Sequence, residues 1–242
     1  MPTKARAYIC LVSAAGMIAM ACSFLDPPWS HDPTRYAAYF ALSLFAAALK
    51  LHLPGLTGTM SIGFVFVLFG ISELTLPETM LMASAGVLVQ CFWRAKQRPS
   101  AVQVIFSVSA VAISLMLAYQ CCRLVRAHWR MDTVAVALAI ATSIYFAGNS
   151  LLVSGVLALV KREPMRAVWQ QCYLFAFPYY LLGGVVATMM AAACRESGWK
   201  LPLLLLPVMG LAFLFCRILL ARLALRPVPV PAQQLPEMRR AS

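Results

Sequence analysis

The chain has 242 residues, of which 62% are hydrophobic and 12% are charged, and its mean hydropathy is +0.80. Soluble domains are typically about half apolar and about a quarter charged, so a soluble core of this size could not bury so much apolar surface. The apolar runs are long and continuous, which excludes a transmembrane β-barrel with its short alternating segments. The composition therefore predicts an all-α, polytopic helical membrane protein.

The formal charge of +12 does not indicate nucleic-acid binding, because no basic stripe interleaves with exposed aromatic residues. The basic residues form short clusters between apolar runs, as expected for loops beside a membrane. Eight cysteines are present without a Cys-x-x-Cys pair, so neither a disulfide scaffold nor a metal site is predicted. No cofactor is predicted.

The pattern predicts about eight transmembrane helices, with seven as the alternative, because a span needs roughly 20 apolar residues. They form one transmembrane domain over residues 1–225, followed by a Pro-rich tail over 226–242 that is expected to be disordered. The first run is interpreted as a retained span rather than a signal peptide. The approximate spans are Tyr8–Leu25, Tyr36–Leu53, Thr59–Leu74, Pro77–Trp93, Ala101–Cys122, Thr133–Val160, Cys172–Cys194 and Leu201–Leu220.

Several helix boundaries carry local signals. Asp32-Pro33 is typical of an N-cap followed by a first-turn proline. Thr75 and Glu78 have the spacing of a capping box, and Thr59 is expected to cap the third span. Glu163-Pro164 predicts a further helix start, with Trp169 as an interfacial anchor.

The distribution of basic residues predicts the topology. With both termini in the cytoplasm, 14 of the 20 Lys and Arg residues fall inside, which favours a multi-pass membrane protein in that orientation. The basic loop over residues 123–130 argues against it. Two tight spans broken near Gly148-Asn149 would flip every later loop, but the segment is too short for two spans. One long helix is predicted, with a break near Gly148-Asn149 left open.

Five polar residues are candidates for ligand binding: Thr59, Ser61, Asn149, Tyr179 and Tyr180. Each also has a structural interpretation. Helix capping is the favoured role of the two hydroxyl residues, and hydrogen bonding between helices is the favoured role of Asn149. The two tyrosines follow a proline that frees a backbone carbonyl in a spanning helix. For them a ligand wall and a packing role carry equal weight.

The acidic pair Glu73 and Glu78 could hold a proton or a cation, but a catalytic role is not expected. The capping box accounts for Glu78, and Glu73 is expected to be solvated near a membrane end. The sequence contains no metalloprotease helix, Walker loop, nucleophile elbow or dinucleotide fingerprint. The sequence thus predicts a protein that is not an enzyme.

Parts of the chain resemble a known family of bacterial membrane sensor regions. These parts are residues 53–61, residues 76–79, the segment Tyr145–Ser150, Trp169, and Phe177–Leu181. They are similar to the membrane-associated sensor (MASE-like) regions that precede GGDEF or HD-GYP output domains, and the resemblance extends from about Tyr36 to Leu225. Neither output motif is present, and Leu225 is followed by Arg226-Pro227. The resemblance therefore implies a multi-pass protein of a bacterial inner membrane that senses without cyclic-dinucleotide chemistry.

Two functional hypotheses follow. The first is an integral inner-membrane protein, sensor-like or regulatory, that binds a small or apolar ligand or senses the bilayer and signals through a partner. Its expected partners are membrane lipid, a separate cytoplasmic output protein and a second copy of the chain. The alternative is a solute-binding transporter or transporter subunit, motivated by the open break in the sixth helix and by the Pro-Tyr-Tyr segment.

Overall fold

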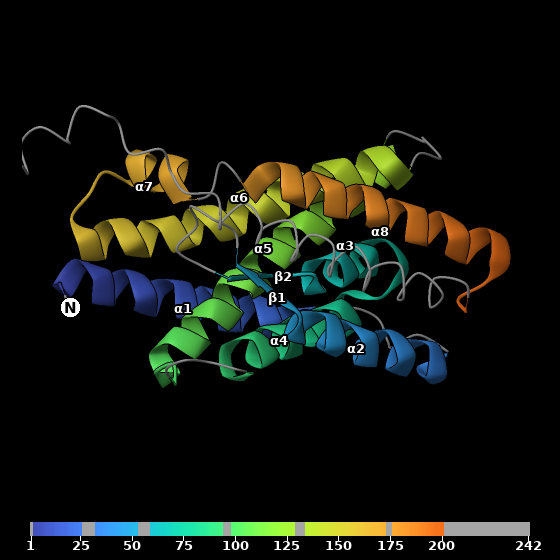
Figure 1. Ribbon diagram of the computed structural model, residues 1–242, viewed down its shortest axis with the longest axis horizontal. Coiled ribbons are helices and arrows are strands. Elements are labelled where there is room, and N and C mark those ends of the chain that lie inside the picture. Colours follow the sequence, from blue (N-terminus) through green and yellow to red (C-terminus); the bar gives the residue numbers. More distant parts are fainter. Residues whose placement is uncertain are drawn as a thin grey trace, which may run out of the picture. The chain divides into compact units, whose positions relative to one another are not determined.

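A computed structural model of the protein describes residues 2–25, 32–52, 59–93, 98–128, 134–172 and 176–200 (Figure 1). Over these ranges the chain is helical, apart from an antiparallel pairing of β1 (Lys50–His52) with β2 (Thr59–Ser61). The helices are α1 (Thr3–Ser23), α2 (Pro33–Ala48), α3 (Gly63–Glu73), α4 (Leu76–Phe92), α5 (Ala101–His128), α6 (Val134–Lys161), α7 (Met165–Cys172) and α8 (Phe177–Ser197).

Four of the described helices, α1, α5, α6 and α8, are long and apolar enough to cross a membrane. Helices α3 and α4 are apolar but shorter. The helical class predicted from composition is thus confirmed, with four helices of spanning length where eight spans were predicted. The predicted eighth span, Leu201–Leu220, and the predicted tail over 226–242 lie outside the described residues.

Helix α3 differs from the third span predicted for Thr59–Leu74. Thr59 belongs to β2 and the helix begins at Gly63, so the prediction that Thr59 caps this helix is wrong. Eleven residues extend over roughly 16 Å, about half of a hydrocarbon core. Every residue from Gly63 to Ile71 is buried, and α3 packs against α2, α4 and α8. A helix that is apolar on every side belongs in a protein core or in a membrane, and the burial of α3 among α2, α4 and α8 places it in the core.

Helices α5 and α6 pack along each other, with α1 against α5 and α8 against α6. Small residues set these contacts. A Cβ on Gly16 would collide with the backbone of Ser109, and one on Gly148 would lie 2.9 Å from the Ser114 hydroxyl. Close approach at small residues is how membrane helices gain packing energy.

The break considered near Gly148-Asn149 is absent, because α6 is one α-helix from Val134 to Lys161. Gly148 permits the close approach of α5 without unwinding the backbone. The Asn149 side chain lies close to the Tyr180 hydroxyl on α8. The polar and flexible residues that signalled a break thus serve contacts between helices.

Three predicted boundaries are confirmed. The backbone N–H of Arg35 donates to Asp32 Oδ1 at 3.0 Å, at the start of α2. The fully buried Glu78 carboxylate accepts from the Thr75 backbone N–H at 3.0 Å and from its hydroxyl at 2.9 Å. Helix α7 begins at Met165, directly after Pro164.

Candidate functional site

Aromatic side chains from four helices meet between α6 and α8, and we call this group the aromatic cluster. Phe146 on α6 lies 5.0 Å from Tyr180 and 5.1 Å from Phe177, measured between ring centroids. Phe64 on α3 lies 4.7 Å from Tyr180. The rings are tilted to one another, as aromatic pairs prefer. The cluster consists of Phe64, Tyr145, Phe146, Trp169, Phe177, Tyr179 and Tyr180.

The structure brings together three of the five predicted ligand-binding residues. Tyr179 and Tyr180 belong to the aromatic cluster, and the Asn149 side chain lies close to Tyr180 across the α6–α8 contact. Thr59 and Ser61 belong to β2, which contacts α2, and Ser61 is buried there. A ligand-binding role for these five residues stays a prediction.

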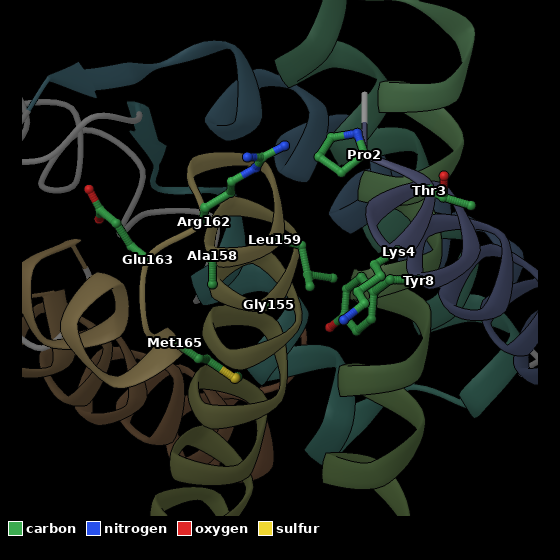
Figure 2. A pocket seen from close by; sticks show the side chains of 10 residues that line it. All are labelled: Pro2, Thr3, Lys4, Tyr8, Gly155, Ala158, Leu159, Arg162, Glu163 and Met165. Atoms are coloured by element: carbon green, nitrogen blue, oxygen red, sulfur yellow. The ribbon is translucent and has the colours of Figure 1, made fainter.

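A cavity of about 870 Å³ lies between the start of α1, the end of α6 and the start of α7 (Figure 2). Its volume is within the range of small-molecule sites, which is roughly 300–1,000 Å³. Sequence reasoning missed the cavity because its walls come from segments about 150 residues apart. The only signal was the basic character of both segments. The cavity is lined by Pro2, Thr3, Lys4, Tyr8, Gly155, Ala158, Leu159, Arg162, Glu163 and Met165.

Tyr8 and Gly155 form part of the inner wall of this cavity. The Tyr8 hydroxyl donates to the carbonyl oxygen of Leu152 at 3.1 Å, which ties α1 to α6. A Cβ at position 155 would lie 2.5 Å from the Tyr8 hydroxyl oxygen. Glycine is therefore required for the tyrosine to lie against α6 at this depth.

Arg162 lies at the end of α6 with a φ of 60°, in the left-handed region that favours glycine. The Glu163 N–H donates to the Ala158 carbonyl at 3.2 Å, which is the closing bond of a Schellman motif. In Figure 2 the Arg162 guanidinium extends from the end of α6 toward the side of α1, whereas the Glu163 carboxylate points to the opposite side. A positive side chain is thus held at the edge of the cavity by an unfavourable backbone conformation.

Helix α7 connects the cavity to the aromatic cluster. Met165 lines the cavity, and Val168, one turn later, is buried against Ala158. The Trp169 indole N–H then donates to the Ser150 hydroxyl at 3.0 Å, and its ring lies 6.5 Å from that of Phe146. One short helix therefore contacts both regions.

A group of charged residues, which we call the Glu73 cluster, consists of Arg35, Glu73 and Arg195. Arg35 lies 3.4 Å from one carboxylate oxygen of Glu73, and Arg195 lies 3.2 Å from the other. The Glu73 side chain is only 11% exposed, so the prediction that it is solvated is wrong. Arg35 on α2 and Arg195 on α8 reach it from distant parts of the sequence, which local patterns cannot reveal.

Further hydrogen bonds surround the Glu73 cluster. The buried Tyr39 hydroxyl donates to the Trp199 carbonyl at 2.7 Å, which connects α2 to the segment after α8. Arg126 on α5 donates to the carbonyl of Ser72 at 3.4 Å. At the other end of α5, Phe106 contacts the cavity residue Tyr8, with ring centroids 6.4 Å apart. The 20 residues between Phe106 and Arg126 correspond to roughly 30 Å of helix, which is the thickness of a hydrocarbon core.

Within the described ranges, no three His, Cys, Asp or Glu side chains converge as a metal-binding group. Comparisons with protein families, with curated proteins and with solved structures find no match to this chain. The residues of the cavity, the aromatic cluster and the Glu73 cluster are therefore what bears on function.

Proposed function

We propose that the protein is an integral inner-membrane protein of a sensor-like or regulatory kind. It binds a small or apolar ligand in the cavity between α1, α6 and α7 and passes the occupied state to a partner protein. The observation that carries this proposal is that α7 contacts both the cavity and the aromatic cluster. The resemblance to bacterial membrane sensor regions supports the same class. The basic asymmetry of the sequence supports cytoplasmic termini.

The contacts define a route for such a signal. An eight-residue helix is too short to be stable alone, so the position of α7 depends on what it touches. A ligand against Met165 changes those contacts, and Trp169 carries the change to Phe146. Phe146 packs on Tyr180 of α8. The ligand acts through a difference in affinity for two positions of α7, as any ligand-driven switch requires.

A cavity-filling substitution tests this route. In Leu159→Trp a large ring occupies the cavity, so amide hydrogen exchange in α7 and the first turns of α8 is expected to change severalfold. The matched control is Leu151→Trp, on the same helix at a side chain that is 41% exposed. Equal exchange profiles for the two variants would contradict signalling through α7.

The partner is tested in native membranes. Affinity purification of wild-type protein and of Leu159→Trp is expected to recover the same partner protein from both. The recovered amount should differ between the two forms, because the cavity is filled only in Leu159→Trp. Recovery of no partner from either form, after chemical cross-linking, counts against a signalling role and leaves ligand binding as a separate question.

A second candidate, a solute-binding transporter, is favoured by α3. Short helices preceded by non-helical backbone line the binding sites of many transporters, and α3 follows β2 in the protein interior. The continuity of α6 removes one of the two motives for this hypothesis, and the Pro-Tyr-Tyr segment at the start of α8 remains. Reconstituted vesicles should show uptake from a broad panel of labelled solutes, and absence of uptake with correctly folded protein would exclude transport of the solutes in the panel.

A further inference from the structure

We propose that the cavity binds an anionic phospholipid. Lys4 and Arg162 hold the phosphate, and an acyl chain lies along Tyr8, Ala158 and Leu159. The inference deepens the proposed function, because it names the chemical class of the ligand in the same cavity.

The walls of the cavity combine exposed charged residues with buried apolar ones. Lys4 and Arg162 are exposed, at the beginning of α1 and just beyond the end of α6. Gly155 and Ala158 lie one to two turns earlier on α6 than Arg162 and are buried. From Gly155 to Arg162 the cavity extends over roughly 10 Å along the helix axis. A charged edge above an apolar wall fits an amphipathic ligand whose phosphate stays at the membrane surface.

The backbone at Arg162 gives a second, independent indication. The left-handed conformation that closes α6 is one that glycine adopts without cost and arginine does not. An unfavourable conformation retained at a cavity edge points to a role for the side chain. The guanidinium group offers several N–H donors in a plane, a geometry that matches phosphate oxygens.

The charges around this end of the bundle favour an anion. Five basic residues lie in the first turn of α1 and around the start of α7, against one acidic residue, Glu163, whose carboxylate points away from α1 in Figure 2. Such clusters attract anionic lipid at a membrane surface. The basic residues are Lys4, Arg6, Lys161, Arg162 and Arg166.

A lipid rather than a soluble phosphate is the proposed ligand because of the apolar wall. A soluble phosphate would contact Lys4 and Arg162 but leave the partly exposed side chains of Leu159 and Tyr8 uncovered. An acyl chain removes that apolar surface from water, at roughly 0.8 kcal/mol per buried methylene group. Both parts of the cavity are then used by one molecule.

The test uses the full chain in neutral detergent after removal of native lipid. Phosphatidylglycerol, phosphatidylcholine and glycerol phosphate are titrated separately, and bound lipid is measured by native mass spectrometry alongside the melting temperature. Phosphatidylglycerol is expected to bind and raise the melting temperature, phosphatidylcholine to bind more weakly, and glycerol phosphate to have no effect.

Two pairs of substitutions separate a site from general attraction. Lys4→Gln and Arg162→Gly should each weaken phosphatidylglycerol binding by about fivefold, and Arg162→Gly should fold at least as stably as wild type. Arg6→Gln and Arg166→Gln remove equal charge at the same end without touching the cavity. They should change binding by less than about twofold.

Two outcomes would overturn the lipid site. Equal losses in both pairs would mean diffuse attraction to basic residues, and equal binding of glycerol phosphate would mean a site for soluble phosphate. Either result leaves the proposed function intact if Leu159→Trp still changes exchange in α8. If that variant also has no effect on α8, the signalling proposal fails separately.

Discussion

The surroundings of the two ends of α5 use charged residues in different ways. Near Arg126, ion pairs to the Glu73 carboxylate, which is 11% exposed, and the hydrogen bond of the buried Tyr39 hydroxyl join α2, α3 and α8. Near Phe106, the charged residues are exposed and surround a cavity instead of one another. At the Arg126 end, charged side chains form ion pairs that connect helices. At the Phe106 end, the charged side chains that line the cavity are exposed. Stability and binding are therefore expected to respond to different mutations.

The largest difference in stability between the two ends should come from a Glu→Gln substitution, made once at each end. Glu73→Gln removes both ion pairs from a side chain that is 11% exposed and leaves two arginines without their counter-charge. The free energy of unfolding should fall by about 2 kcal/mol, between the values for exposed and buried pairs. Glu163→Gln changes an exposed residue and should alter it by less than about 0.5 kcal/mol. Thermal unfolding in detergent measures both, and equal losses would end the comparison.

Removal of a tyrosine hydroxyl gives the next effect. Tyr39→Phe removes the hydroxyl that donates to the Trp199 carbonyl from a fully buried side chain, and it should cost about 1 kcal/mol. Tyr8→Phe removes the bond to Leu152 beside the cavity, where water can replace the hydroxyl, and should cost about 0.5 kcal/mol. Denaturant or thermal unfolding of the two variants decides the order, and a larger loss for Tyr8→Phe contradicts it.

Loss of the hydrogen bond that connects α7 to α6, between the cavity and the aromatic cluster, should have a small effect on stability. Ser150→Ala removes the acceptor of the Trp169 indole N–H and should cost about 1 kcal/mol or less. Its main effect should be faster amide exchange in α7, because that helix depends on its contacts. Ser143→Ala is a suitable control, since its hydroxyl bonds only within α6 in the described contacts. Unchanged exchange in α7 would show that the indole bond does not position it.

One substitution, Arg162→Gly, should slightly increase the stability of the protein. Arg162→Gly relieves the left-handed backbone after α6 and should raise the free energy of unfolding by about 0.5–1 kcal/mol. The exposed Arg166, within α7, has no such conformation, and Arg166→Gly should instead lower it by about the same amount. Melting temperatures compared at matched detergent concentration test the opposite signs. A loss on Arg162→Gly would mean that the arginine stabilises the fold.

Local patterns predicted much of the fold because they depend on neighbours in the sequence. The start of α2 at Asp32-Pro33 and the capping interaction of Glu78 are set by residues within one turn. The long apolar runs likewise predicted α5 and α6. The limits of α3 could not be predicted, since pairing of β1 with β2 overrides the helical pattern at Thr59.

The candidate sites were predicted less well, for the same reason. Asn149 and Tyr180 were recognised as polar groups in apolar segments, and they meet across two helices. The cavity depends on Lys4 and Arg162, which lie far apart in the chain. Glu73 was expected to be solvated because its arginine partners come from α2 and α8. Contacts of this range are properties of the packing, which no local pattern encodes.

The short length of α3 has a consequence for how the protein is made. Its 11 residues cannot enter a bilayer as an independent span, and its packing surface on α8 is synthesised more than 100 residues later. During synthesis, α3 can therefore pack against α2 and α4 first, and its surface that contacts α8 stays uncovered until α8 has been made. A ribosome-bound chain that ends before α8 should leave α3 accessible to a chaperone or a membrane insertase, and completion of α8 should close that period of exposure.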